Sequence, residues 1–358
     1  MNNSKIQIKL INKFNSYYSS KNYKCAKAEK ILSNIDPSTI FIGSTISPLK
    51  KYLNNTIPVC GLSIIQPCIR TQKSDYFYNN DKILEYNSFF IQAGILSSAN
   101  NYERICDESI EFLTKIIGID KKLIKVKINR NDADLYCYWK RQSTIKIEVN
   151  SHTNNYYRWN YGIDQIIGKG LTYAIKKDGA NIYRDIGNII IIYKKRKKIA
   201  VEWGFGIETL ISRIYNLPKP QSASKICDIL PFREGLQEKT MDTLVTAIEM
   251  YKLGIKPGMG RERHLLKTYL KGLDYLRRKL NIPIKRIKEI AEIYQKNDKQ
   301  CLDISNELVY FLEQRDLQRK KYSNWSRDIM ASCLARGIDP KTSLIKLQAK
   351  LGLRALDI

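Results

Sequence analysis

The sequence predicts an α+β fold in which an antiparallel sheet is backed by helices and followed by an all-helical domain. In the first part of the chain, segments with period-two alternation follow one another through short turns, and helical segments are set apart from them. Beyond about residue 235 only helical periods occur. At about 150 residues per domain, 358 residues fit two domains. We place these at 1–216 and 235–358, with a linker at 217–234.

The first domain is predicted to mix helices and strands. Apolar residues recur at three- and four-residue spacing in 5–20 and 103–117, which predicts two amphipathic helices. Alternating residues predict strands at 124–128 and 144–149. The segment GNIIIIYKKRKKIAVEWG predicts two further strands joined by a basic turn at 194–198. Strands joined by short turns indicate an antiparallel sheet and not a doubly wound nucleotide-binding fold.

The second domain is predicted to be entirely helical. Prolines and small polar residues in LPKPQSASK, 217–225, indicate the start of the linker. Helical periods then predict five helices, at 238–254, 261–281, 284–296, 299–320 and 340–351.

The charge balance favours a polyanionic partner. The chain has 61 Lys and Arg residues against 35 Asp and Glu, a net charge of +26. Such a surplus favours nucleic acid through counterion release and electrostatic steering. The alternative is that the lysine-rich, asparagine-rich and isoleucine-rich composition reflects an AT-rich genome, which would account for part of the excess.

The cysteines argue against a metal site. Eight cysteines are scattered without a CxxC pair, and only two histidines could join them as ligands, so we expect neither a structural zinc nor a disulfide framework. The N-terminal segment has charges among its apolar residues, and the longest aliphatic run is the four isoleucines 189–192. We therefore expect no signal peptide, no membrane span and a cytoplasmic location.

Two glycines lie between a predicted strand and a predicted helix in VEWGFGIETLISRI, residues 201–214. Gly204 and Gly206 allow the backbone to bend sharply and to approach a ligand, and the N–H groups at a helix start attract an anion. The simpler interpretation is a tight strand-to-helix turn without a ligand. The pattern by itself leaves both interpretations open.

Several stretches of the chain resemble class II aminoacyl-tRNA synthetases in their alanyl-tRNA synthetase form. VEWGFGIETLISRI is similar to the VDTGMGLERI of that family's third motif, and QPCIRTQKSD to the QKCVRAGGKHND of its second motif. Other similar stretches are IDPSTIF, NSFFIQAGILSSANNYERICDESIEFLTKIIGI and TAIEMYKLGIKPGMGRERHLLKTYLKGLDYLRRKLNI. Their order and spacing agree with the family from about residue 10 to about residue 354.

The resemblance implies a class II synthetase fold with a catalytic domain at 1–216 and a helical, tRNA-binding domain at 235–358. Members of the family continue into editing and C-terminal domains beyond the resembling region, and we expect this chain to lack both. The family's cofactors are ATP and Mg²⁺, and its partners are tRNA and a small amino acid.

The resemblance also assigns residues to an ATP site. Arg70, at the position of the second-motif arginine, would hold the substrate carboxylate and the α-phosphate, and Lys73 would reach the outer phosphates. Phe90 would stack on adenine. The third motif adds Gly204, Gly206 and Thr209. The alternatives are a surface ion pair for Arg70 and a core position for Phe90.

Three residues are assigned to the amino acid. Glu202 matches the family's aspartate that binds the amino group, and a carboxylate there would pair with an ammonium. Trp159, in YRWNYG, would wall a small side-chain pocket, and Asn188, in DIGNIII, would support the site. The alternatives are a solvated strand-end glutamate, a core tryptophan and a polar strand position.

The chain departs from the family at several positions. Thr209 stands where the third-motif arginine is expected, a loss of about 1.5–3 kcal/mol or about ten- to a hundredfold in rate or binding. Arg213, one turn later, would either substitute for it or be a solvated helix charge. Gln92 replaces a glutamate, and IIGKGLTY at 166–173 replaces the family's GPCGPCSE, so the amino acid need not be alanine.

The basic surplus is concentrated in the helical region. Residues 256–288 contain eleven basic and two acidic residues. We predict RNA contacts by Arg261, Arg263, Lys267, Lys271 and Arg278, the alternative being a solvated helix face. The family's two polar readers of the tRNA acceptor stem have no counterpart in PGMGR, 257–261, or CLARG, 333–337.

Three functions remain open from the sequence. The first is a ligase that forms an aminoacyl adenylate and charges tRNA. The second is an activating enzyme with a non-tRNA acceptor, favoured by the missing acceptor-stem readers. The third is a non-catalytic RNA-binding or amino-acid-sensing protein, suggested by Thr209 and Gln92.

Overall fold

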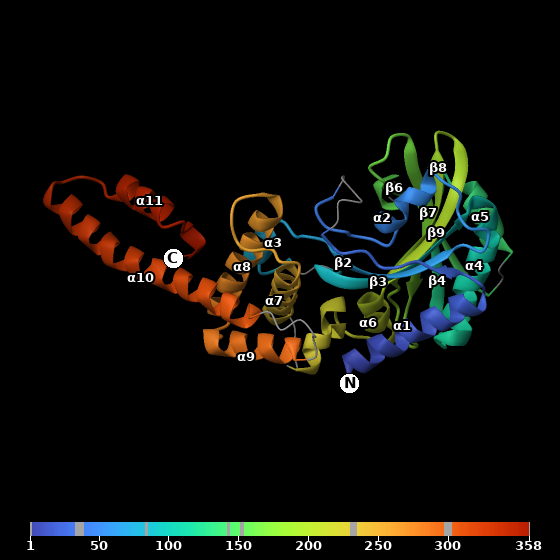
Figure 1. Ribbon diagram of the computed structural model, residues 1–358, viewed down its shortest axis with the longest axis horizontal. Coiled ribbons are helices and arrows are strands. Elements are labelled where there is room, and N and C mark those ends of the chain that lie inside the picture. The colour runs from blue at the N-terminus through green and yellow to red at the C-terminus, as the bar shows by residue number, and fades with distance from the viewer. Residues whose placement is uncertain are drawn as a thin grey trace. The chain divides into compact units, whose positions relative to one another are not determined.

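The computed structural model describes residues 2–32, 39–82, 85–141, 144–150, 154–229, 235–296 and 303–357. The chain divides into two compact units (Figure 1). Unit 1 consists of Met1–Arg70 and Leu84–Asp228, and unit 2 consists of Thr71–Ile83 and Ile229–Ile358. Residues 71–83 therefore belong with the C-terminal helices, although they lie within the predicted first domain, 1–216.

Unit 1 is built on a nine-stranded sheet in the order β1-β2-β3-β9-β8-β7-β4-β5, with β6 paired to β7 beside this path. The pairs are antiparallel except β1–β2 and β4–β5. The helix α5 (Ala133–Lys140) joins β4 to β5 and supplies the crossover that a parallel pair requires. The predicted α+β class is confirmed, and the sheet is mixed. Its strands are β1 (Lys24–Cys25), β2 (Leu62–Ile69), β3 (Phe89–Ser98), β4 (Ile124–Asn129), β5 (Lys146–Asn150), β6 (Arg158–Asn160), β7 (Ile166–Ile175), β8 (Arg184–Lys194) and β9 (Lys197–Gly206).

The larger helices of unit 1 cover one face of this sheet, and the helical segment at residues 46–53 packs on part of the other face (Figure 1). The predicted helices 5–20 and 103–117 are confirmed as α1 (Asn3–Ser20) and as α4 (Tyr102–Glu111) continued by the π-helical turn η3 (Phe112–Ile116). Their apolar sides meet β9 in an aromatic core of Phe14, Tyr18, Phe112, Trp203 and Phe205. The other helical segments of unit 1 are α2 (Ile46–Leu49), η1 (Lys50–Leu53), η2 (Ala99–Asn101), η4 (Lys121–Leu123), η5 (Asn154–Tyr157) and α6 (Ile207–Ile214), followed by η6 (Pro220–Ala223) and η7 (Lys225–Asp228).

The predicted strands of unit 1 are confirmed, with boundaries shifted by a few residues. Residues 124–128 and 144–149 correspond to β4 and β5, and the hairpin predicted around 194–198 is β8 and β9. Lys195 in its turn has a φ of 58°, a left-handed conformation that tight hairpin turns require.

The predicted linker, 217–234, differs from the structure over its first half. The side chain of Asn3 in α1 donates to the carbonyl oxygens of Ser222 and Ser224, and that of Gln7 donates to the carbonyl of Ala223 at 2.8 Å. Asp228 accepts from the backbone of α1 at Asn3 and Ser4. Residues 217–228 therefore form part of unit 1, because α1 binds their backbone, and 230–234 lie outside the described residues.

Unit 2 is entirely helical in its described part, as predicted. The predicted helices 238–254, 261–281, 284–296 and 340–351 correspond to α7 (Leu236–Lys252), α8 (Arg261–Lys279), α9 (Ile284–Gln295) and α11 (Lys341–Lys350). The helix predicted at 299–320 is α10 (Ile304–Ala335), and residues 299–302 lie outside the described part. The unit also holds α3 (Ser74–Tyr78) and η8 (Ala355–Asp357).

Residues 71–83 are held in unit 2 by specific contacts. The ammonium group of Lys239 in α7, which is buried, donates to the carbonyl oxygens of Tyr76 and Asn79 at 2.7 and 2.6 Å. The ring of Phe77 packs edge-on against Tyr269 of α8, whose hydroxyl oxygen accepts from the N–H of Gln72 at 2.9 Å. These contacts explain why a short segment that follows β2 packs with distant helices.

No helix in the described part of the chain combines the length and the apolar character that crossing a membrane requires.

Candidate active site

The candidate site lies on one face of the unit 1 sheet, opposite the aromatic core. Side chains alternate between the two faces of a strand. Trp203 and Phe205 of β9 pack with Phe14 of α1. Glu202, Gly204 and Gly206 therefore face the other side.

The sheet register brings the predicted pocket residues onto that side. Gly206 lies opposite Gln92 of β3, and Gly204 lies opposite Asn188 of β8. Asn188 in turn lies opposite Thr172 of β7, whose hydroxyl donates to the Asn188 amide oxygen at 2.9 Å. Asn188 is thus a polar position with a buried hydroxyl partner on the candidate site face.

Arg70 follows the last residue of β2 and lies over Phe90. Its backbone N–H donates to the carbonyl of Ser88 at 2.8 Å, and its Nε donates to the carbonyl of Gly43 at 2.7 Å. The guanidinium carbon is 4.9 Å from the centroid of the Phe90 ring, a cation–π distance. Phe90 is buried and packs with Ile42 and Cys68. Arg70 as a whole residue is exposed, while burial lowers the pKa of its guanidinium from the usual value.

Glu202 is a buried carboxylate with a tyrosine partner. The hydroxyl of Tyr161 donates to Glu202 Oε1 at 2.6 Å, and both residues are buried. The sheet neighbours of Glu202 are Leu96 and Ile190, which are apolar. Burial raises the pKa of Glu202 to about 7, against a smaller lowering by the Tyr161 hydrogen bond. The alternative of a solvated strand-end glutamate is wrong for this residue.

Tyr161 is a site residue that the sequence analysis missed. It follows Trp159 by two residues at the end of β6, the spacing of side chains on one strand face. Trp159 lies opposite Gly168 of β7, and a Cβ at Gly168 would lie 3.0 Å from the Tyr161 hydroxyl. The period-two pattern from Trp159 could have indicated Tyr161. Trp159 is half-buried beside the apolar cluster on this face, so packing and a pocket wall are both compatible with its position.

Gly204 permits a close approach between the sheet and residues 43–45. The amide oxygen of Gln92 accepts from the backbone N–H of Thr45 at 2.9 Å. A Cβ at Gly204 would lie 3.2 Å from Gln92 Nε2 and 3.5 Å from Thr45 Oγ1, and a Cβ at Gly94 would collide with the Thr45 side chain. The glycines therefore keep this part of the face open to Thr45 and Gln92.

The start of α6 holds a second buried carboxylate. Gly206 is the N-cap residue, and a Cβ there would lie 3.0 Å from Thr209 Oγ1. Glu208 accepts from the backbone N–H of Ile91, with its nearer oxygen at 3.1 Å. Burial raises the pKa of Glu208 to about 7. Thr209 thus lies directly beside the glycine turn, where the resembled family has a cation.

Arg213 does not point toward this turn. Its Nη2 donates to Glu85 Oε2 at 2.8 Å, and its side chain is 3% exposed. Lys219 also pairs with Glu85. The interpretation of Arg213 as a solvated helix charge is wrong, because its side chain is buried and paired with the half-exposed Glu85, which its helix period does not reveal.

Lys73 belongs to unit 2. It lies directly before α3 with an extended backbone, φ −69° and ψ 152°. Its assignment to the outer phosphates of ATP stays a prediction. The other residues predicted for the ATP and amino-acid sites belong to unit 1: Arg70, Phe90, Trp159, Asn188, Glu202, Gly204, Gly206 and Thr209.

The described residues contain no group of three or more His, Cys, Asp and Glu side chains that could hold a metal ion. Two carboxylates lie near the glycine turn in sequence, and each accepts a hydrogen bond. Glu202 accepts from the Tyr161 hydroxyl, and Glu208 accepts from the Ile91 N–H. Mg²⁺ commonly binds one or two carboxylates together with substrate phosphates. These side chains therefore do not form a preformed Mg²⁺ cage, whereas the exposed Arg70 fits a phosphate group. The expectation of no structural zinc stays a prediction.

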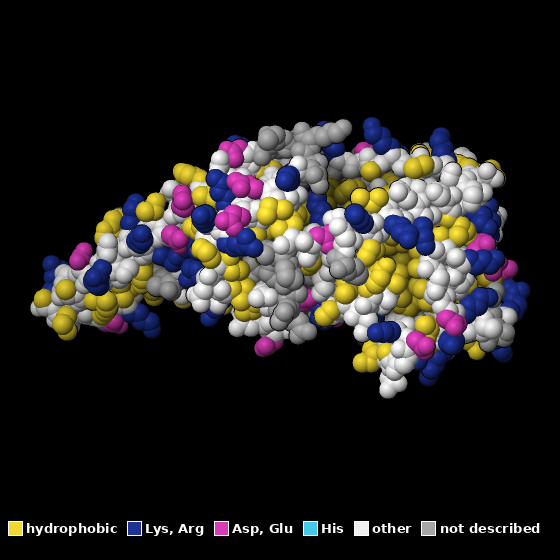
Figure 2. Space-filling model, turned by 90° about the horizontal axis from the view of Figure 1, so that it is seen from below, with side chains coloured by type: hydrophobic (Ala, Val, Ile, Leu, Met, Phe, Trp, Pro, Cys, Tyr) yellow, Lys and Arg dark blue, Asp and Glu magenta, His cyan; other side chains and the backbone are white. Residues whose placement is uncertain are grey.

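The predicted RNA-binding residues lie on α8. Arg261, Arg263 and Lys267 are exposed. Lys271 is half-buried and donates to the carbonyl of Gly352, and Arg278 lies 3.9 Å from the fully buried Asp274. The first three are thus directly available to a phosphate backbone, and the last two also contact unit 2 itself. Figure 2 shows one face of the molecule, on which Lys and Arg side chains outnumber acidic ones.

The family model of class II (A) tRNA synthetases matches residues 9–202. Alanine–tRNA ligase of Bacillus subtilis (strain 168) is 22% identical over 256 residues, which cover 63% of this chain and 29% of the ligase. Alanine–tRNA ligase of Bacillus mycoides (strain KBAB4) is 20% identical over 386 residues, covering 93% of this chain and 43% of that ligase. The chain thus spans less than half the length of these curated relatives.

Solved structures of class II synthetases are also similar, at low scores. A putative threonyl-tRNA synthetase of Aeropyrum pernix has a TM-score of 0.40 and 9% identity, with 69% of each chain covered. At this score the likeness adds nothing to the assignment. The family model covers more than half of the 358 residues, and the chain therefore belongs to the class II aminoacyl-tRNA synthetases, with alanine–tRNA ligases among its curated relatives.

Proposed function

We propose that the chain activates an amino acid with ATP and transfers the resulting acyl group to tRNA, in the manner of alanine–tRNA ligases. The observation that carries this proposal is that Glu202 of β9, Phe90 of β3 and Arg70, which follows β2 and lies over Phe90, are on the same side of one sheet. A guanidinium and a carboxylate on one face can bind the two ends of an amino-acid zwitterion.

The proposed reaction joins two anions. A carboxylate oxygen of the amino acid attacks the α-phosphorus of ATP, the bond from that phosphorus to the bridging oxygen breaks, and pyrophosphate leaves. Cations must neutralise the charge that develops on the phosphate oxygens. Arg70 would do so, since its Nε is fixed by the Gly43 carbonyl and its guanidinium lies over the Phe90 ring. Phe90 would lie beneath the same nucleotide.

Glu202 would bind the ammonium group. Its pKa of about 7 leaves it partly protonated at neutral pH when no substrate is bound. An ammonium placed beside it would favour the ionised form. The buried Tyr161 hydroxyl would keep Glu202 in position while the substrate enters.

ATP and Mg²⁺ are proposed as cofactors. When bound, Mg²⁺ would neutralise phosphate charge, held through the phosphates of ATP. Because Thr209 lacks the charge of the family's arginine and Arg213 is paired with Glu85, we expect activation to be slower than in a ligase that has that arginine.

The domain roles are proposals as well. We assign catalysis to the region 1–216, tRNA binding to the helical region 235–358, and a cytoplasmic location to the protein. The exposed cations of α8 support the RNA role.

A second candidate is activation of an amino acid for a non-tRNA acceptor. The observation that favours it is the sequence of 257–261 and 333–337, where the polar readers of the acceptor stem are missing. Phosphate contacts position a nucleic acid, but base contacts specify it.

Pyrophosphate exchange with each of the twenty amino acids tests the proposal, followed by acylation of total tRNA with any that exchange. We expect exchange with one small amino acid, and its loss in Arg70→Ala. Arg196→Ala, an exposed arginine in the β8–β9 turn, is the matched control and should exchange normally. Exchange without charged tRNA would favour the second candidate. No exchange with any amino acid would contradict activation and favour a non-catalytic role.

A further inference from the structure

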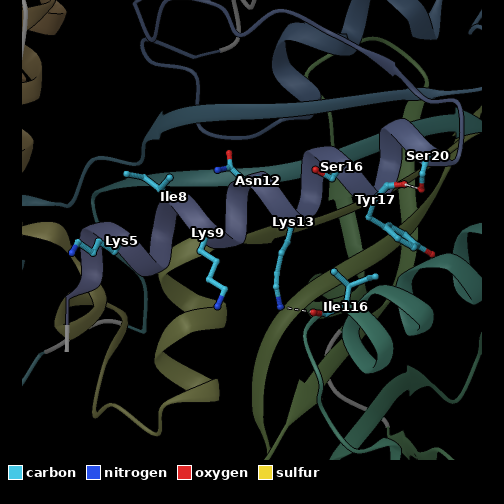
Figure 3. Close-up of a pocket in the computed structure, with 9 residues that line it drawn as sticks. All are labelled: Lys5, Ile8, Lys9, Asn12, Lys13, Ser16, Tyr17, Ser20 and Ile116. Carbon is cyan, nitrogen blue, oxygen red and sulfur yellow. Dashed lines mark hydrogen bonds between the residues drawn. The ribbon is translucent and has the colours of Figure 1, made fainter.

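A shallow groove runs along α1 in unit 1 (Figure 3). Its volume is about 670 Å³. It is lined by one side of α1 and by Ile116 at the end of η3. The lining residues are Lys5, Ile8, Lys9, Asn12, Lys13, Ser16, Tyr17, Ser20 and Ile116.

Three lysines follow one another along this groove. Lys5, Lys9 and Lys13 are spaced by four residues, so they lie on one side of the helix, about 6 Å apart along its axis. The eighteen residues of α1 contain no acidic residue. In the described part of the chain, Lys5 and Lys9 are exposed and form no ion pair. A row of like charges destabilises a helix, and a bound anion would remove that cost.

The remaining polar groups of the groove are hydrogen-bond donors. Lys13 Nζ donates to the carbonyl of Ile116 at 2.6 Å, as the dashed line in Figure 3 marks. The Tyr17 hydroxyl donates to the Glu111 carboxylate, and the Ser20 hydroxyl donates to the backbone carbonyl of Tyr17. Both hydroxyl protons are therefore already used within unit 1. Asn12 and Ser16 are exposed beside the lysines. Lysine, asparagine and serine side chains are typical donors to phosphate oxygens.

The charge of the groove favours RNA over a protein partner. Protein interfaces are centred on aromatic or apolar anchors that enter well-packed pockets. Here Ile8, Tyr17 and Ile116 supply apolar surface between the lysines, and the larger apolar side chains of α1, Leu10 and Phe14, are buried in the core. None of the lining residues is acidic. Three lysines without an acidic lining residue fit a sugar–phosphate backbone, whose contacts are mostly electrostatic.

We propose that this α1 groove binds the phosphate backbone of RNA, as a second contact surface that does not include α8. The proposal does not depend on catalysis, since it concerns RNA affinity alone. The groove can therefore fail to bind RNA in a protein that activates an amino acid, and it can bind RNA in a protein that does not.

The test compares two double variants that each remove two positive charges. Lys5→Gln with Lys9→Gln removes the unpaired lysines of the groove. Lys122→Gln with Lys198→Gln is the matched control, because each of these exposed lysines is paired with a carboxylate, Asp120 and Asp134. Fluorescence anisotropy with labelled total tRNA and with a labelled 20-nucleotide oligouridine gives the dissociation constant at several salt concentrations.

We expect the groove variant to lower the slope of log affinity against log salt by about 1.4–1.8, which corresponds to tens-fold weaker binding near 0.1 M salt. The control should keep the wild-type slope, and neither variant should melt appreciably below the wild type. Equal losses in the two variants would overturn the proposal, because they would show a general charge effect. Unchanged RNA affinity in the groove variant would also overturn the proposal, and loss of binding to an acidic helical peptide in the same variant would then indicate a protein surface.

Discussion

At the scale of single residues, Glu202 shows how burial sets the chemistry of the site. A glutamate at the end of a strand would ordinarily be solvated, but the register places this one between Leu96 and Ile190 with Tyr161 as its donor. Transfer of a carboxylate from water disfavours its charged form. The residue type was thus predictable from the sequence, whereas its protonation was not.

This burial makes the stability of the protein depend on pH. In the folded state Glu202 keeps its proton up to a pKa of about 7, whereas the unfolded chain releases it near 4.5. The free energy that Glu202 contributes to folding is therefore fully present below pH 4.5 and is lost as the pH rises toward 7, by about 3 kcal/mol at most. Glu208 contributes in the same direction.

In Tyr161→Phe, the free energy that Glu202 contributes to folding should be lost over a range that extends to higher pH. The Tyr161 hydrogen bond lowers the pKa of Glu202, so its removal should raise that pKa further. Urea unfolding at pH 5 and pH 8 should show a larger difference between the two values in Tyr161→Phe than in the wild type. Glu202→Gln should show a smaller difference than the wild type, since one carboxyl group with a raised pKa is then removed. An identical pH dependence in all three proteins would contradict the assignment.

Thr209 defines a second prediction at this scale. Thr209→Arg restores a cation beside the glycine turn, so pyrophosphate exchange should rise about ten- to a hundredfold, equivalent to about 1.5–3 kcal/mol. Thr342→Arg adds the same charge to an exposed position of α11 and should leave exchange unchanged. If Thr209→Arg catalyses pyrophosphate exchange at the wild-type rate, the side chain at position 209 does not lie beside a phosphate of ATP.

At the scale of elements, the strands and helices with a clear period were predicted with the correct type. The β8–β9 hairpin and α1 have long, regular apolar patterns, and both follow their predicted spans closely. The predicted helix 299–320 ends too early, because α10 continues to Ala335. In its second half Trp325, Met330 and Leu334 are exposed, so no apolar stripe marks that half as helical.

The packing of α3 on α8 gives a prediction for one glycine. A Cβ at Gly272 would lie 2.6 Å from Cγ of the buried Phe77, so the ring or the helix must move. Alanine is a better helix former than glycine by about 1 kcal/mol, but overpacking of a core costs about 1–3 kcal/mol. Gly272→Ala should therefore lower the free energy of unfolding by up to about 2 kcal/mol in urea titrations.

Gly258→Ala is the control for this change. The nearest atom to a Cβ at Gly258 is Arg263 Cδ at 3.4 Å, in a flexible side chain. Its effect should stay within about 0.5 kcal/mol. A Gly272→Ala protein as stable as the wild type would show that the contact between α3 and α8 is looser than described.

At the scale of the whole molecule, the net charge of +26 is divided between structural and available cations. Around the buried Asp274, the side chains of Arg277, Arg278, Arg315 and Arg319 form an ion-pair network that is internal to unit 2. A buried carboxylate requires such partners. The number of basic residues in 256–288 therefore overstates the charge that an RNA can reach.

This division predicts different effects for two sets of substitutions. Arg263→Gln combined with Lys267→Gln should lower the salt slope of RNA binding by about 1.4–1.8 without changing the melting temperature, because both side chains are exposed. Arg278→Gln should instead lower the melting temperature, because it removes a partner of Asp274. Anisotropy titrations and thermal unfolding of the same samples distinguish the two. A slope that is unchanged in the first variant would remove α8 from the RNA surface.

The sequence by itself determined the fold class, most of the helices and strands, and the residue types of the site. These depend on local periodicity and on motifs that are short in sequence. The resemblance to class II synthetases depends on the same local information, and the family model agrees with it over residues 9–202.

Only the tertiary structure decided which residues share an environment. It paired Tyr161 with Glu202, bound Arg213 to Glu85, and placed residues 71–83 with the helices of unit 2. Each of these depends on contacts between segments far apart in sequence, and on the burial that follows from them. Periodicity records which side of an element is apolar, but it does not record which other element will cover that side.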